Sequence, residues 1–157
     1  MKEHLEHPII QAATAVRVTS AEGRQWFLDL ESHPERYQFE THAGFAFSRG
    51  NFGENGARFQ TWERFLGLTI NLHFELIETS NTQILFRLIR PPLPIWCAFA
   101  VKEVTGDTID LSLKVGGTSR AGEQLLRLPI VRGIIQRQIT SEIEHIKTSM
   151  ETLHNSA

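Results

Sequence analysis

Residues 122–153 read GEQLLRLPIVRGIIQRQITSEIEHIKTSMETL, and this stretch decides the fold. Its apolar side chains recur three or four positions apart, the spacing that places them on one stripe of an α-helix. A long helix with a single apolar stripe must bury that stripe against another element. The stripe consists of Leu128, Val131, Ile135, Ile139, Ile143, Ile146, Met150 and Leu153.

Two residues divide this stretch into a short and a long part. Pro129 and Gly133 are unfavourable in the middle of a helix, whereas proline is well tolerated in a first turn. We therefore expect the long helix to begin at Pro129, with residues 121–128 forming a separate short turn. The second half of the helix should seal the core, and the first half, around Leu128 and Val131, should lie at the entrance of a cavity.

The partner of the helix is predicted by residues 42–115, which read as six consecutive strands. In TINLHFELIE, residues 69–78, apolar and polar side chains alternate, as expected for a strand with one buried face. The turns between the strands are short, so neighbouring strands must pair antiparallel. With one more strand within residues 8–18, the sequence predicts an α+β fold in which a long helix grips a curved antiparallel sheet of about seven strands.

Two short helices are expected between the first strand and the rest of the sheet. Thr19 followed by Glu22 is a capping-box pattern that begins a helix, and Pro34 ends or bends that helix. A second helical turn then leads to Tyr37. We expect a flexible N-terminal tail at 1–7, a single domain at 8–153 and a C-terminal tail at 154–157.

The composition narrows the possible partners and the compartment. The formal net charge of −2 provides no bulk attraction to phosphate backbones, so nucleic acid is not expected as a partner. Cys97 is the single cysteine, which rules out an intramolecular disulfide and suits a reducing compartment. Residues 1–7 lack the apolar segment of a secretory signal, and the longest apolar stretch, 91–101, is too short to cross a bilayer as a helix. These features predict a soluble, cytoplasmic protein without integral membrane association.

The order of elements and several local motifs resemble the START-like superfamily, also called SRPBCC. Within it, the chain is similar to small polyketide cyclase/dehydrase-type proteins and to the birch-pollen-allergen-like proteins of plants. The resemblance covers residues 8–151, and the insertion PPLP at 91–94 departs from the family pattern. The matching pieces are TSAEGRQWFLDLESHPERY, a glycine-rich turn before ARFQTWERFLG, HFELIE, TGDTIDLSLKV and IEHIKTSME.

The resemblance implies a helix-grip fold with an internal apolar cavity between the sheet and the long helix. Members of the family bind or carry lipids, sterols, hormones and polyketides, and a minority catalyse cyclisation or dehydration. No universal catalytic motif comes with the family, so the catalytic residues stay unknown. The residues expected to line the cavity are Phe45, Phe47, Phe59, Thr61, Glu63, Leu72, Phe74, Phe86, Leu88, Phe99, Leu111, Leu113, Leu128, Val131, Ile135 and Ile139.

Glu63 is the one candidate for chemistry. It shares strand parity with Phe59 and Phe65, so its carboxyl should point inward, where burial would raise its pKa and make it a possible general acid or base. A bulge that turns the side chain outward, or an internal pair with an arginine, are the structural alternatives. Thr61, on the same face, could donate a hydrogen bond to a ligand oxygen.

The histidines suggest no metal site. His73 falls on the solvent-facing side of its strand. His42 and His145 have no other metal-ligating residue at a recognisable ligand spacing. His4 and His7 are three apart but lie in the expected tail without a third ligand. We therefore expect no metal and no cofactor.

Three functions remain open. The leading hypothesis is binding or transport of a hydrophobic small molecule, a lipid, sterol, polyketide or aromatic compound, with mobile lid segments at GNFGENG (50–56) and PPLP (91–94). The alternative is a cyclase/dehydrase-type enzyme in which Glu63 lies in the cavity beside another polar group. A protein-interaction module would instead have an exposed apolar patch and no cavity.

Overall fold

A computed structural model describes residues 2–157, with side chains from His4 onward. Its centre is one seven-stranded sheet in which every neighbouring pair is antiparallel, in the order β1-β7-β6-β5-β4-β3-β2. The α+β prediction is confirmed. The strands are β1 (Ile10–Val16), β2 (His42–Arg49), β3 (Arg58–Phe65), β4 (Leu68–Thr79), β5 (Gln83–Arg90), β6 (Ile95–Thr105) and β7 (Thr108–Gly117).

The helices fall where capping and proline signals place them. At α1 (Ser20–Leu28), the Thr19 hydroxyl accepts from the Glu22 amide and the Glu22 carboxylate from the Thr19 amide, both at 3.1 Å. The 3-10 turns η2 (Asp29–Glu31) and η3 (Pro34–Tyr37) follow. A short α2 (Arg120–Arg127) precedes the long α3 (Pro129–Ser156), which begins at the expected proline.

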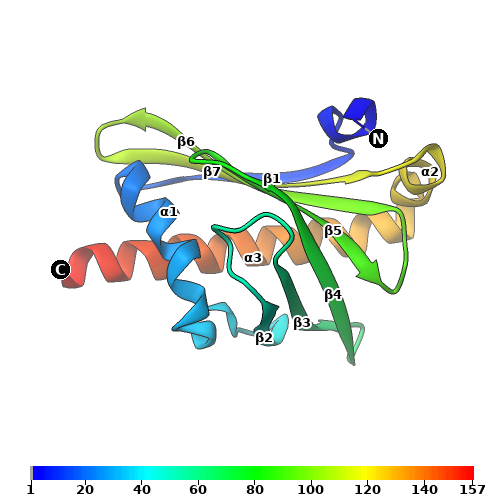
Figure 1. The fold of residues 1–157 in the computed structure, drawn as a ribbon, viewed down its shortest axis with the longest axis horizontal. Helices are drawn as coiled ribbons and strands as arrows, with labels where there is room; N and C mark the ends of the chain where they lie inside the picture. The colour runs from blue at the N-terminus through cyan, green and yellow to red at the C-terminus, as the bar shows by residue number, and fades with distance from the viewer. Residues whose placement is uncertain (1) are drawn as a thin grey trace.

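The long helix α3 runs along the concave side of the sheet from one end of the molecule to the other (Figure 1). It extends through Ser156, so the residues expected to form a C-terminal tail are mostly helical. At the N-terminus, Lys2–Glu6 form the 3-10 helix η1 where a flexible tail was expected. The Trp96 indole nitrogen donates to the His4 carbonyl oxygen at 3.0 Å, which ties η1 to the convex side of the sheet.

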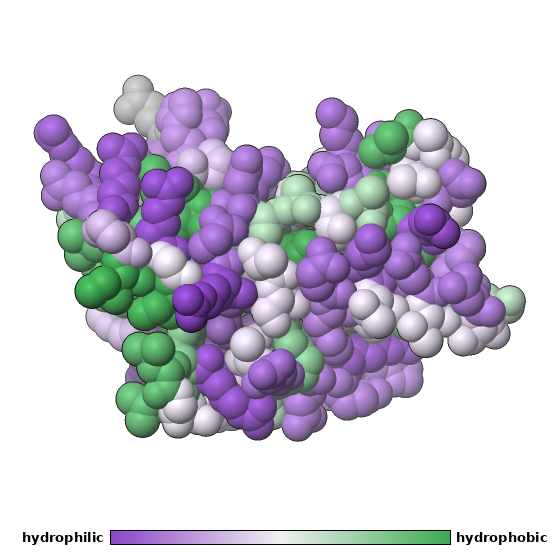
Figure 2. Space-filling model, turned by 180° about the vertical axis from the view of Figure 1, so that it is seen from behind, coloured by the Kyte–Doolittle hydropathy of each residue, from purple (hydrophilic) through white to green (hydrophobic). Residues whose placement is uncertain are grey.

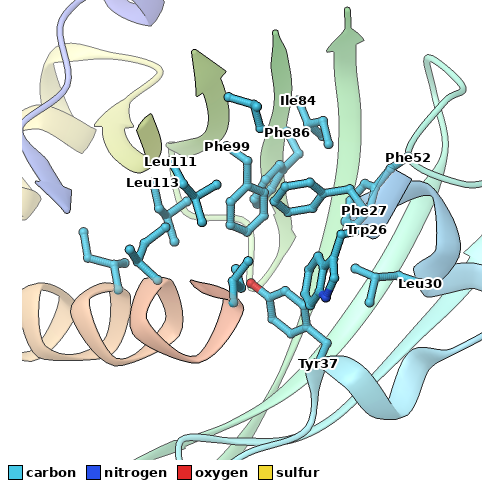
Figure 3. Close-up of a cluster of buried hydrophobic side chains, with 14 of the residues drawn as sticks. Trp26, Phe27, Leu30, Tyr37, Phe52, Ile84, Phe86, Phe99, Leu111 and Leu113 are labelled. Atoms are coloured by element: carbon cyan, nitrogen blue, oxygen red, sulfur yellow. The ribbon is translucent and has the colours of Figure 1, made fainter. Parts of the chain in front are cut away.

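Aromatic side chains fill the end of the core beneath α1. Phe27 from α1 lies 4.8 Å from Phe99 on β6, centroid to centroid, and Phe99 lies 5.6 Å from Phe86 on β5. Figure 3 shows these rings converging from the helix and the strands on one space. This end is solid because α1, the η turns and the second half of α3 all pack here. The other end, beneath the first half of α3, is not filled.

Candidate functional site

A cavity of about 280 Å³ lies between the concave face of the sheet and α3. Its wall is mostly aromatic and aliphatic, and its two solvent-exposed lining residues, Ile70 and Leu93, mark its mouth. Residues from six strands, β2 to β7, contribute because alternate positions of each curved strand face inward. The lining residues named from sequence are Phe45, Phe59, Thr61, Glu63, Leu72, Phe74, Phe86, Leu88, Phe99, Leu113, Ile135 and Ile139.

Four residues expected in the wall lie outside it. Phe47 packs at the far end of β2, where its ring meets that of Phe52 at a centroid distance of 5.0 Å. Leu111 is fully buried in the solid part of the core. Leu128 caps the junction of α2 and α3 and is half exposed, and Val131 packs against the core without reaching the cavity. Alternation in a strand and periodicity in a helix predict which face a side chain lies on. They do not predict whether that part of the strand or helix lies beside the cavity.

The loops supply wall residues that parity could not indicate. Phe52, in the glycine-rich turn at 50–56, is fully buried and lines the cavity, so this turn packs inward over the core. Pro91 and Leu93 from PPLP line the mouth. The complete set of lining residues not anticipated from sequence is Tyr37, His42, Phe52, Phe65, Ile70, Pro91, Leu93, Ile95, Cys97, Val115, Gln138 and Glu142.

Five polar side chains on the cavity wall form one cluster, which we call the polar cluster: His42, Thr61, Glu63, Gln138 and Glu142. Each of them is less than a tenth exposed. The β2–β3 register places His42 opposite Glu63, and Thr61 lies two positions away on the same face of β3. Gln138 and Glu142 are four apart on α3, so both point from the helix toward these strands.

Glu63 faces inward, as its strand parity predicted. The Thr61 hydroxyl donates to its Oε2 at 2.6 Å, and the Gln138 amide donates to its Oε1 at 3.4 Å. Burial nevertheless dominates and raises the pKa of Glu63 to about 7, although both hydrogen bonds lower it. At neutral pH this carboxyl can therefore either release or accept a proton.

Glu142 and His42 complete the cluster. Burial raises the pKa of Glu142 to about 8. The His42 Nε2 lies 3.4 Å from Glu63 Oε1 and 3.6 Å from Glu142 Oε2, and neither ring nitrogen makes a hydrogen bond within residues 4–157. Burial lowers the pKa of His42 to about 3, and the charge of His145 acts in the same direction.

The His42 ring is held by stacking. Phe39 lies between His42 and His145, stacked on both at centroid distances of 4.8 and 4.1 Å. His145 is fixed in turn by the Arg36 carbonyl oxygen, 2.7 Å from its Nε2. The neighbours of His42 and His145 are aromatic and backbone groups of other elements, which the spacing of metal ligands along the sequence does not address. The positions of Gln138 and Glu142 could have been predicted from the sequence. Both fall at the three- or four-residue spacing of the apolar stripe between Ile135 and Ile146, so they share the buried face of the helix.

Cys97 lies on the cavity wall, and burial raises the pKa of its thiol well above the usual range. A protonated thiol in this place is a small apolar wall residue rather than a nucleophile. Within residues 4–157, no group of three or more His, Cys, Asp or Glu side chains is arranged to hold a metal ion. The chemistry of the site therefore resides in the polar cluster.

Comparison with known proteins identifies the fold. No family model and no curated protein sequence matches the chain. Among solved structures, the Zhui aromatase/cyclase from Streptomyces sp. R1128 superposes with a TM-score of 0.70 at 8% identity, covering 90% of this chain and 92% of that chain. A START superfamily protein from Mycobacterium smegmatis gives 0.64 at 13% identity, covering 94% and 97%.

A third solved structure has the same fold. A point mutant of norcoclaurine synthase from Thalictrum flavum, in complex with a transition-state analogue, gives a TM-score of 0.66 at 11% identity, covering 94% of this chain and 95% of that chain. The chain has the helix-grip fold of the START-like superfamily, as the sequence motifs indicated. Identities this low establish the fold alone. Within residues 2–157, no helix is long and apolar enough to cross a membrane.

Proposed function

We propose that the protein binds a compact, largely aromatic small molecule in the cavity, with a hydrogen-bonding group of that molecule against the polar cluster. The observation that supports this most directly is a fully buried imidazole, His42, on the wall of an apolar cavity without a hydrogen bond of its own. A buried polar group without a partner is costly. A ligand hydroxyl or amine would supply that partner.

The size and wall of the cavity favour a ligand of one or two rings. Its volume of about 280 Å³ is just below the range of typical small-molecule pockets, roughly 300–1,000 Å³. The rings that line it come from Tyr37 and from phenylalanines on β2 to β6 and the glycine-rich turn, and they can contact an aromatic ligand both face-on and edge-on. Sterols and long-chain lipids fit this volume poorly.

The polar cluster also selects against charge on the ligand. Burial holds Glu63 and Glu142 partly or fully protonated near neutral pH, and no arginine or lysine lines the cavity. An anionic group pressed against two carboxyls would gain no compensation for its own desolvation. We therefore expect the buried end of the ligand to be neutral or cationic, such as a phenol or an amine.

A thermal-shift experiment with a matched pair of compounds tests this proposal. 2-Naphthol and 2-methoxynaphthalene have the same rings and differ in one hydroxyl donor. A concentration about 100 times Kd stabilises a protein by about 2.7 kcal/mol, which corresponds to several degrees in Tm. We expect 2-naphthol to raise Tm more than its methyl ether. In His42→Phe, which keeps a ring beside Phe39, the difference should disappear; if neither compound raises Tm, the proposal is rejected.

A second function, acid–base catalysis on the bound molecule, is favoured by Glu63. Its pKa of about 7 is matched to proton transfer at neutral pH, and Thr61 and Gln138 hold its two oxygens at the cavity wall. A dehydration is one reaction that this arrangement could serve. A carboxylate removes the α-proton of a β-hydroxyketone, the C–O bond breaks, and a neighbouring protonated carboxyl delivers a proton to the departing hydroxide.

The catalytic proposal is tested with 4-hydroxy-4-phenylbutan-2-one, whose dehydration gives a conjugated enone that is followed by absorbance. We expect Glu63→Gln to lower the rate by about 100-fold, the lower limit for general acid–base catalysis, while the thermal shift with 2-naphthol is retained. A wild-type rate equal to that of buffer would reject dehydration of this class.

The cytoplasmic location and the single domain at 8–153 remain predictions from the sequence.

A further inference from the structure

An exposed apolar surface surrounds the mouth of the cavity. Of the eight large hydrophobic side chains exposed in the described part of the chain, six lie on three segments that also line the cavity. We call these segments, residues 64–74, 90–96 and 124–141, the rim. The six side chains are Leu66, Leu68, Ile70, Leu93, Leu128 and Ile130.

The rim occupies one end of the molecule. The β3–β4 turn, the β5–β6 loop and the start of α3 all lie at the end opposite the C-terminus (Figure 1). Seen from behind, hydrophobic side chains gather at that end, on the left, among hydrophilic ones (Figure 2). The two remaining exposed hydrophobics, Val104 in the β6–β7 hairpin and Leu153 near the C-terminus, lie at the opposite end.

The charge of the rim is entirely positive. Its three segments contain five arginines and no aspartate or glutamate, while the whole chain has a formal net charge of −2. The rest of the chain therefore carries a formal net charge of −7. All five arginine side chains are exposed: Arg64, Arg90, Arg127, Arg132 and Arg137. Leucine and isoleucine beside arginine is the composition of elements that lie on anionic lipid surfaces.

The β3–β4 turn gives an independent indication. Leu66 and Gly67 form its two-residue loop, with φ angles of 50° and 79°, and Phe65 pairs with Leu68. Turns with two positive φ angles favour asparagine or aspartate followed by glycine, because a larger side chain is strained there. Leu66 accepts this strain although its side chain is 83% exposed and contributes little to the core. Folding alone does not account for a leucine at this position.

We propose that the rim docks on an anionic lipid surface, with Leu66 and Leu68 among the acyl chains and the arginines at the headgroups. The most projecting rim side chains, Leu66 and Ile130, are 83% and 78% exposed on separate segments. Such projections enter a fluid lipid phase directly, whereas a protein partner would need a matching pocket for each. Docking would place the mouth of the cavity against the bilayer, so an apolar ligand could enter without crossing water.

Vesicle co-sedimentation of the whole protein tests this proposal. We expect binding to vesicles of phosphatidylcholine with about 30% phosphatidylglycerol, weaker binding to pure phosphatidylcholine, and loss of binding as salt is raised. Leu66→Asn should reduce binding about tenfold, because it removes an inserted side chain. The same change should leave the urea midpoint equal or higher, because asparagine suits the turn. A merely structural role for Leu66 predicts no loss of vesicle binding.

The matched control is Val104→Ser with Leu153→Ser, which removes exposed apolar side chains from the opposite end. This variant should bind vesicles as the wild type does. The proposal is overturned if the wild type does not sediment with anionic vesicles, as expected if the rim instead meets an acidic protein, or if the control loses binding equally. Vesicle binding by a protein that takes up no aromatic ligand would support docking and reject the proposed function, so the two failures are distinguishable.

Discussion

Replacing Glu142 with glutamine is expected to stabilise the protein by about 5 kcal/mol at pH 9 and to change its stability little near pH 4.5. Burial raises the pKa of Glu142 from 4.5 to about 8, and each pKa unit corresponds to about 1.4 kcal/mol. Between these two values the folded protein holds a proton that the unfolded chain has released. The wild type therefore loses stability as pH rises through this window, and glutamine, which does not titrate, removes the loss.

The measurement is the difference in urea unfolding free energy between Glu142→Gln and the wild type at a series of pH values from 4.5 to 9. Below pH 6.5 a second effect enters, because the lowered pKa of His42 makes the folded state lose stability as pH falls toward 3. Glu144→Gln is the matched control, since Glu144 is exposed on the same helix and its replacement removes no buried group. Equal pH dependence in the wild type and in Glu142→Gln would contradict the burial of this carboxyl.

Replacing Leu72 with tryptophan is expected to weaken binding of 2-naphthol by about 100-fold, or about 2.7 kcal/mol. Leu72 lies on β4 opposite Thr61 and lines the cavity. An indole at this position would occupy space that the ligand needs. Because the indole fills an existing cavity, Tm of the unliganded protein should not fall.

Thr69→Trp provides the control for Leu72→Trp. Thr69 lies on the same strand, is exposed and does not line the cavity. Calorimetric titration of both variants with 2-naphthol should show weak binding only for Leu72→Trp. Equal affinity in the two variants would mean that the ligand binds elsewhere.

The sequence predicts the elements of this fold well because each carries its own local signal. The strands alternate, the capping box at Thr19 and Glu22 begins α1, and Pro129 begins α3. Strand parity also predicts that Glu63 faces inward, because β3 pairs with β4 without a register shift around it. Such features depend on neighbours in sequence.

The polar cluster depends on contacts between distant residues, so sequence gives little of it. His42 on β2 and Glu142 on α3 are a hundred residues apart along the chain, and their side chains come together only in the folded protein. Leu128 shows the reverse error: it fits the helical stripe but lies half exposed where α2 turns into α3. Periodicity identifies the buried face of a helix, but not the point at which the core ends.

The central claim is that the cavity between the sheet and α3 holds a compact aromatic molecule. An NMR titration of isotopically labelled wild-type protein with 2-naphthol tests this claim most directly, because it locates the ligand. We predict saturable chemical-shift changes concentrated on cavity-lining residues, including Thr61 and Glu63 on β3 and Gln138 and Glu142 on α3. Changes confined to the exposed rim or spread over the surface, with those four residues unaffected, would contradict it.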